Sequence, residues 1–353
     1  MTVEIKKYVG AVLMAVASAL LAIDGIWQAG LHRHWTFVAM ELAAIVCLVA
    51  ESVVGFRKKA PSGVLSHAGM ALILAGGLAG SQLGVDSYHK IYVGQEEHLS
   101  FDIALEQFET EYYPDGATPR QFTSTLLLDG KIIEASVNHP ARYKGWRIYQ
   151  TGLGEDGSGR YSVLRVVRSP LLPLLALGAL MLVAGAALSL KNVRRSKKVI
   201  VAEIILACIF AAATLVEINF GTLPPALRSP WFVPHLAAYM LAYALLATSV
   251  LFIRRELFSV LLSAASSLLL FGMLCGAFWA QQAWGSCWDW DPKECWAAAT
   301  WLLTLSAVHV PSRNKSLKVI LAVLAFLTMN MTWYGVNLLP SSTVSLHTYN
   351  VLR

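Results

Sequence analysis

Residues 284–301 read WGSCWDWDPKECWAAATW, and this tryptophan-rich stretch decides how the rest of the chain is interpreted. It holds five of the eleven tryptophans and four charged residues, and it lies between two long apolar runs. A helix start with a capping box is indicated by Asp291 as the capping residue, Pro292 at the first helical position and Glu294 at the third. We therefore expect a loop or surface helix up to Trp290 and a helix from Pro292. An interfacial aromatic belt is the simpler explanation, but a belt distributes indoles over many helix ends.

The composition indicates a polytopic α-helical membrane protein. Of 353 residues, 56% are hydrophobic and only 14% are charged. A membrane span needs about 20 apolar residues. About nine runs satisfy this, at 7–28, 35–56, 63–84, 169–190, 198–218, 231–253, 257–279, 293–311 and 316–338. The first run is too long for a removable signal peptide and lacks a small-residue cleavage site, so we expect it to remain.

The basic residues predict the orientation of these spans. Their clusters lie at 6–7, 57–59, 191–198, 254–255 and 313–318. All five fall on one side if the nine spans alternate, and positive loops face the cytoplasm. The N-terminus is then cytoplasmic and the C-terminus outside, with residues 85–168 and the tryptophan-rich loop also outside. The net charge of +6 is therefore explained by the orientation of the spans and does not indicate nucleic-acid binding.

The strand and turn patterns of residues 85–168 predict a small β-rich extracytoplasmic domain inserted between the third and fourth spans. FTSTLLLDGKIIEASVN (122–138) reads as a hairpin turning at Asp129-Gly130. WRIYQTG and YSVLRVVRS read as further strands, with a loop over 152–159. We expect the histidines of this domain, and His32 and His34 in the first outer loop, to be surface residues.

Four histidines fall into two pairs at matching depth. His67 and His309 lie about one turn from the cytoplasmic ends of their spans, whereas His235 and His347 flank spans on the outer side. Ligating residues inside spans are functional candidates by default. The pairs suggest two bis-imidazole sites for a flat macrocycle such as haem. A zinc site lacks the further ligands it needs, and each histidine alone is as compatible with helix packing.

Several other residues accompany these histidines in the interpretation. Indole faces can pack against a porphyrin, and Lys293 or Arg228 can meet its propionates. Four carboxylates are expected to make inward polar contacts or to relay protons: Asp24, Glu41, Glu203 and Glu217. Cys287 and Cys295 flank the loop, and their pairing is the less favoured alternative.

The loop closely resembles the "WWD" signature, W-G-x-x-W-x-W-D-P-K-E-x-W-A, of haem-handling proteins in cytochrome c maturation. It is most similar to the CcsA (ResC) type of System II. WFVPHLAAYMLAYALL around His235 and LHTY around His347 resemble that family's two external ligand segments. HAGMALILAGG around His67, residues 112–130 and residues 137–152 resemble CcsB (ResB) proteins.

The resemblance implies a fused CcsB–CcsA cytochrome c synthase. Its parts are CcsB-like helices 1–3 (1–84), the β-rich domain (85–168), CcsB-like helix 4 (169–190) and a CcsA-like domain (198–353) with the WWD loop at 284–296. The family's H-S-Y-G appears as residues 347–350, and the final span expected after it is not in the sequence, which ends at Arg353.

The resemblance also implies the chemistry. Such a protein exports haem b across the bacterial inner membrane and attaches it by thioether bonds to the C-x-x-C-H motif of apocytochrome c on the periplasmic side. The residues implied in haem binding are the axial ligands His235, His347, His67 and His309, with Trp284, Trp288, Trp290, Asp291 and Trp296 beside them. Thiol-reducing proteins and the lipid bilayer are further partners, and no catalytic residue is implied beyond those that position haem.

Other functions fit the same residues. The chain has no C-x-x-C-H of its own, so it is not a c-type cytochrome. It could deliver haem to a separate synthase, or it could be a b-type membrane cytochrome that uses the four histidines for quinol electron transfer. The insert could also recruit apocytochrome while the histidines serve only packing.

Overall fold

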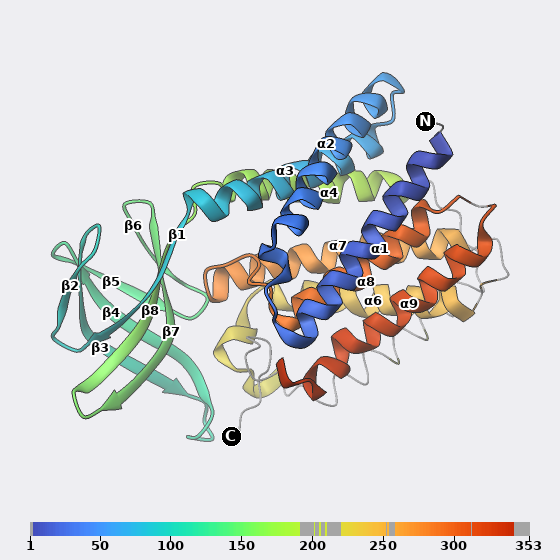
Figure 1. Ribbon diagram of the computed structural model, residues 1–353. Coiled ribbons are helices and arrows are strands. Elements are labelled where there is room, and N and C mark those ends of the chain that lie inside the picture. Colours follow the sequence, from blue (N-terminus) through green and yellow to red (C-terminus); the bar gives the residue numbers. More distant parts are fainter. Residues whose placement is uncertain are drawn as a thin grey trace.

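The computed structural model describes residues 3–190, 201, 205, 209, 220–251, 253, 258–311 and 313–341. Within them, long helices form a bundle, and a β-rich region lies at one end of it (Figure 1). The helices are α1 (Val3–Trp27), α2 (Trp35–Arg57), α3 (Pro61–Leu83), α4 (Leu172–Leu190), α6 (Phe232–Leu251), α7 (Phe258–Ala283), α8 (Pro292–His309) and α9 (Lys315–Trp333). Short 3-10 turns are η1 (Leu31–Arg33), η2 (Phe220–Thr222), η3 (Pro225–Arg228) and η4 (Gly335–Leu338).

Seven of these helices are long and apolar enough to cross a membrane, so the chain is a multi-pass membrane protein. The exception is α8, which occupies the predicted eighth span without reaching the apolarity of the others. The predicted fifth span, 198–218, lies almost entirely outside the described residues. The total of nine spans therefore stays a prediction.

Helix α8 can be less apolar because it lies inside the bundle, packed against α1, α7 and α9. Its buried hydroxyls are satisfied by its own backbone: Thr300 donates to the Trp296 carbonyl at 2.9 Å and Thr304 to the Thr300 carbonyl at 2.8 Å. A buried hydroxyl without a partner would destabilise the fold. The surrounding helices contribute an apolar core that includes Tyr243 and Leu246 of α6.

The β-rich region lies between α3 and α4, as the sequence predicts. Its strands are β1 (Val85–Tyr92), β2 (Glu96–His98), β3 (Asp102–Tyr112), β4 (Pro119–Leu128), β5 (Lys131–Ser136), β6 (Ala141–Tyr143), β7 (Trp146–Asp156) and β8 (Gly159–Arg168). They form two antiparallel four-stranded sheets, in the orders β1-β8-β7-β6 and β2-β3-β4-β5. Alternate side chains from both sheets, such as Ile103, Leu126 and Leu164, share one buried core.

One of the two predicted turns in this region is confirmed and the other is wrong. Strands β4 and β5 pair around Asp129 and Gly130, which both have positive φ (44° and 78°), as a tight hairpin requires. The loop predicted over 152–159 is instead mostly strand, because β7 continues to Asp156. Gly154 lies opposite Tyr161, and a Cβ there would be 2.6 Å from the tyrosine oxygen. This glycine therefore makes room for an aromatic side chain across the strand pair and does not mark a loop.

Candidate functional site

The tryptophan-rich loop joins the end of α7 at Ala283 to the start of α8 at Pro292. The predicted helix start is confirmed. The Asp291 side chain accepts a hydrogen bond from the Lys293 amide at 2.8 Å, and the Glu294 carboxylate accepts from the Asp291 amide at 3.2 Å. Glu294 also accepts from the Asp289 amide at 2.9 Å. One buried carboxylate thus holds two backbone amides of the loop and fixes its path into α8.

The indoles of this loop pack against the protein on several sides. Trp290 stacks on His32 with ring centroids 4.5 Å apart and an interplanar angle of 10°, and Trp288 meets Trp290 edge to face at 6.0 Å. Trp284 meets Trp279 of α7 edge to face at 5.7 Å. Trp296 is buried where α8 approaches α1, and no residue in the described part of the chain forms a hydrogen bond with its indole nitrogen. The loop is therefore a rigid aromatic assembly.

Arg165 of β8 joins the β-rich region to this loop. Its guanidinium donates to the Trp284 carbonyl at 2.9 Å and to the Asp289 carboxylate at 3.2 Å. It also pairs with Asp86 of β1 at 2.6 Å. Burial alone would lower the pKa of Arg165, but the hydrogen bonds to Asp86 and Asp289 outweigh burial and raise that pKa above its ordinary value. Arg165 therefore stays charged and ties the two parts of the fold together.

A second contact reinforces this junction. Gln281 at the end of α7 donates to the Tyr149 hydroxyl of β7 at 2.9 Å. The Tyr149 ring lies over Gly285, whose φ is +92° and where a Cβ would be 2.8 Å from the ring. The nearby Cys287 thiol donates to the Gln281 side chain at 3.2 Å. Burial raises the pKa of Cys287 to about 12, so this thiol is un-ionised at neutral pH. Cys287 and Cys295 are both free thiols.

His235 lies near the start of α6, at the end of the bundle that faces the β-rich region. Its Nδ1 is 2.8 Å from the Gly272 carbonyl of α7, and its ring packs against Tyr239 and Trp279. Gly276 gives the ring room, since a Cβ there would be 2.9 Å from Nδ1. A proton on Nδ1, donated to Gly272, leaves the lone pair on Nε2, which is the arrangement usual for a metal-ligating histidine. Because Trp279 contacts both His235 and Trp284, one aromatic chain runs from His235 to the loop.

His67 and His309 both lie at the opposite end of the bundle. His67 is near the start of α3 and interacts electrostatically with His309, at the end of α8, and with Glu51 of α2. The His309 Nδ1 is 2.9 Å from the Leu305 carbonyl. The buried Nδ1 of His67 has no hydrogen-bond partner among the residues that the structure describes. A buried polar nitrogen in this state destabilises the fold by about 1–3 kcal/mol, so the site is suited to a ligand.

Some predicted residues lie outside the described part of the chain. These are His347, Glu203 and Glu217, so the spacing of His235 and His347 stays a prediction. Arg228, one of two cations expected to be able to meet a propionate, donates to the Arg120 carbonyl of the β-rich region at 3.1 Å, and its contact with a propionate stays a prediction. Glu41 is partly buried in α2.

His32 is a residue that the sequence interpretation assigned wrongly. Expected at the surface, it has a side chain only 11% exposed, and its Nδ1 is 2.6 Å from the Asp24 carboxylate. Its buried Nε2 has no hydrogen-bond partner within the described ranges, and its ring covers Trp290. The signal was Asp24 itself: a carboxylate inside an apolar span requires a partner, and His32 follows that span within eight residues.

The fold and these contacts define a polytopic helical membrane protein whose β-rich region is fastened to an indole-rich loop. Comparison with known families extends this description. The model of the family described as cytochrome C assembly protein matches residues 163–343, just over half of the chain. The chain belongs to this cytochrome c assembly protein family. The ResB-like family model matches residues 62–160 of the same chain.

Individual relatives agree with the family match. The chain is similar to cytochrome c biogenesis protein CcsA of Amborella trichopoda, with 47% identity over 88 residues, covering 24% of this chain and 26% of that protein. It is also similar to CcsA of Hordeum vulgare, with 43% identity over 94 residues, covering 25% and 28%. The chain thus spans about a quarter of the length of the curated relatives it matches.

Proposed function

We propose that this protein exports haem b across the bacterial inner membrane and attaches it covalently to apocytochrome c on the periplasmic side. The observation that carries the proposal is the continuous aromatic chain from His235 through Trp279 and Trp284 to the tryptophan-rich loop. Membership of the cytochrome c assembly protein family supports it independently. The β-rich region and the loop, joined by Arg165, then share the periplasmic side.

In this proposal the periplasmic haem iron takes His235 Nε2 as one axial ligand and His347 as the other. The hydrogen bond between His235 Nδ1 and the Gly272 carbonyl, together with Tyr239 and Trp279, holds the imidazole plane in one orientation. A fixed His235 ring would set the direction of its bond to the iron and therefore the plane of the porphyrin, but not the rotation of the porphyrin about that bond. The loop residues Trp284, Trp288, Trp290 and Asp291, together with Trp296 of α8, then border the porphyrin.

The second haem position lies between His67 and His309, at the cytoplasmic end of the bundle in the proposed orientation. Two imidazoles that interact electrostatically, one of them with a buried Nδ1 that has no hydrogen-bond partner in the described part of the chain, are suited to a shared ligand. Haem bound here is substrate on its way to the periplasmic site. The two positions lie at opposite ends of α8, since His309 ends this helix and the tryptophan-rich loop precedes it.

The bond-forming groups belong to the substrates. Each C-x-x-C-H thiol would add across one haem vinyl group: its S–H bond and the vinyl π bond break, and one C–S bond and one C–H bond form, without net oxidation or reduction. The half-buried Cys287 thiol, with its pKa of about 12, is unsuited to act as a nucleophile. The protein's contribution is to hold the vinyl groups where the apocytochrome thiols reach them, which is catalysis by proximity.

Co-production of this protein with an apocytochrome c, in a host without other maturation genes, tests the proposal. We expect haem on the apocytochrome that survives denaturation. Haem bound only to this protein would identify a carrier that serves a separate synthase. Quinol-driven reduction of its haem, unaffected by apocytochrome, would identify a b-type electron-transfer protein.

A further inference from the structure

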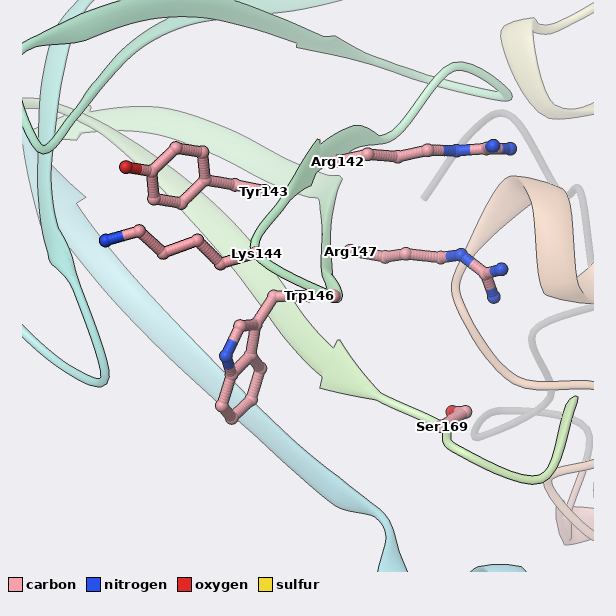
Figure 2. Close-up of a pocket in the computed structure, with 7 residues that line it drawn as sticks. Arg142, Tyr143, Lys144, Trp146, Arg147 and Ser169 are labelled. Carbon is pink, nitrogen blue, oxygen red and sulfur yellow. The ribbon is translucent and has the colours of Figure 1, made fainter.

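A cationic cleft borders the junction between the β-rich region and the tryptophan-rich loop. It has a volume of about 280 Å³ and is lined by the β6–β7 hairpin and by Ser169. Figure 2 shows its side chains: Arg142 and Arg147 extend side by side in one direction, whereas Tyr143 and Lys144 extend the opposite way. The cations of the cleft therefore divide into two sets with different surroundings.

Lys144 has a counter-charge inside the protein. Its ammonium group pairs with the Asp129 carboxylate at 2.5 Å, and Tyr143 donates to the same carboxylate at 2.8 Å. The Lys144 hydrogen bond, with those from the Asp102 amide and Tyr143, lowers the pKa of Asp129 to about 2. Lys144 is thus neutralised locally and is not available to bind a further anion.

Arg142 and Arg147 lack such a counter-charge. They are direct partners in the antiparallel β6–β7 register, so their side chains leave the same face of the hairpin. Like charges directly opposite each other destabilise a strand pair. Across the described ranges, no carboxylate forms an ion pair with either arginine. An anion bound between them would remove this repulsion, and a guanidinium pair matches the two oxygens of a carboxylate.

The position of Arg147 connects this arginine pair with the proposed haem site. Arg147 interacts electrostatically with the Tyr149 hydroxyl and with the Cys287 thiol of the tryptophan-rich loop. Tyr149 in turn accepts from Gln281 and lies over Gly285, the second residue of that loop. The arginine pair is therefore beside the loop against which haem is proposed to lie.

We propose that Arg142 and Arg147 form a carboxylate-binding site that receives a propionate of the haem held at the tryptophan-rich loop. The proposal rests on the function proposed above, and it assigns the β-rich region a direct role in binding haem. A propionate held on the β6–β7 hairpin would fix the rotation of the porphyrin about its axial ligands, and with it the positions of the vinyl groups. The same site could instead receive a carboxylate of the apocytochrome, which has the same chemistry but a different source.

The test uses the full-length protein in detergent and zinc protoporphyrin, whose fluorescence reports binding, beside its dimethyl ester, which has no carboxylates. We expect the wild-type protein to prefer the acid by about two orders of magnitude, since each charge-assisted contact at a half-exposed site contributes roughly tenfold. R142Q and R147Q should each weaken binding of the acid about tenfold and leave the ester unchanged. R147K keeps the charge but not the planar guanidinium, so its affinity for the acid should fall less than that of R147Q.

A matched control and a second ligand separate the outcomes. K90Q removes the same charge at the other end of β7, where Lys90 pairs with Asp156, and should not change the preference. If the wild-type protein binds acid and ester equally, the site does not hold a propionate. Weaker binding of a C-x-x-C-H peptide in R142Q, but not of its carboxylate-amidated form, would then assign the site to the apocytochrome. Unchanged binding of porphyrin and peptide in both variants would overturn the carboxylate site, whereas failure of the wild type to bind either porphyrin would overturn the proposed function instead.

Discussion

Replacing Arg165 by Met should release the tryptophan-rich loop from the β-rich region. Arg165 is only 5% exposed and makes contacts with Asp86, Asp289 and the Trp284 carbonyl. Removing one member of a buried ion pair costs about 3–5 kcal/mol, but an exposed pair contributes at most about 1 kcal/mol. Asp86 is 45% and Asp289 25% exposed, so water can solvate both carboxylates once the arginine is gone. We therefore expect R165M to lower the local stability of this junction by about 2–4 kcal/mol, and the contact with Asp289 accounts for about 1 kcal/mol of that.

Amide hydrogen exchange measures this effect without requiring reversible unfolding of a membrane protein. The amides of Asp289 and Asp291, which both donate to Glu294, report the order of the loop. A loss of 2 kcal/mol or more in local stability should accelerate their exchange by more than about tenfold. In a double-mutant cycle with Asp289→Asn, the coupling should be about 1 kcal/mol.

R168M provides the matched control, because Arg168 is an exposed arginine on the same strand. We expect the exchange of the loop amides to stay unchanged in this variant. Equal exchange rates in wild-type protein, R165M and R168M would refute the view that Arg165 holds the loop in place.

Three further predictions concern the two ends of the bundle. Gly276→Ala should reduce haem at the site near the β-rich region without removing a ligand, because the added Cβ would be 2.9 Å from His235 Nδ1; an absorption spectrum identical to that of the wild type would contradict this. His67→Ala and His309→Ala should each lower the haem content of the purified protein, with partial recovery in added imidazole, whereas unchanged content in both would make these histidines packing residues. Alkylation of Cys287 by iodoacetamide, followed by mass spectrometry, should be about a thousandfold slower at pH 8 than in the denatured chain and should rise with pH towards its pKa of about 12; a plateau near pH 9 would contradict the raised pKa of this half-buried thiol.

The features that the sequence predicted correctly depend on residues close together in the chain. The Asp291–Glu294 capping box and the Asp129–Gly130 hairpin follow from local backbone preferences. The seven apolar helices follow from hydrophobicity over about 20 residues. His67 and His309 lie at the same end of the bundle and interact electrostatically, but their depth in the membrane and their pairing as ligands stay predictions.

The contacts that shape the candidate site depend on residues far apart in the chain. Arg165 and Asp289 are 124 positions apart, and no periodicity connects a strand residue with a loop residue at that distance. The stacking of His32 on Trp290 also depends on residues far apart in the chain. It forms because α1 packs on α8, which brings the segment after α1 to the tryptophan-rich loop. The error over residues 152–159 had another cause, since a glycine that makes room for Tyr161 looks the same in sequence as a glycine in a turn.

The most direct test of the central claim is the absorption spectrum of the purified protein with and without the His235 imidazole. We expect the wild-type protein to carry low-spin haem with bis-imidazole ligation, and His235→Ala to lose the population at the tryptophan-rich loop while haem between His67 and His309 remains. An unchanged bis-imidazole spectrum in His235→Ala, together with undiminished haem attachment to apocytochrome c, would contradict the account.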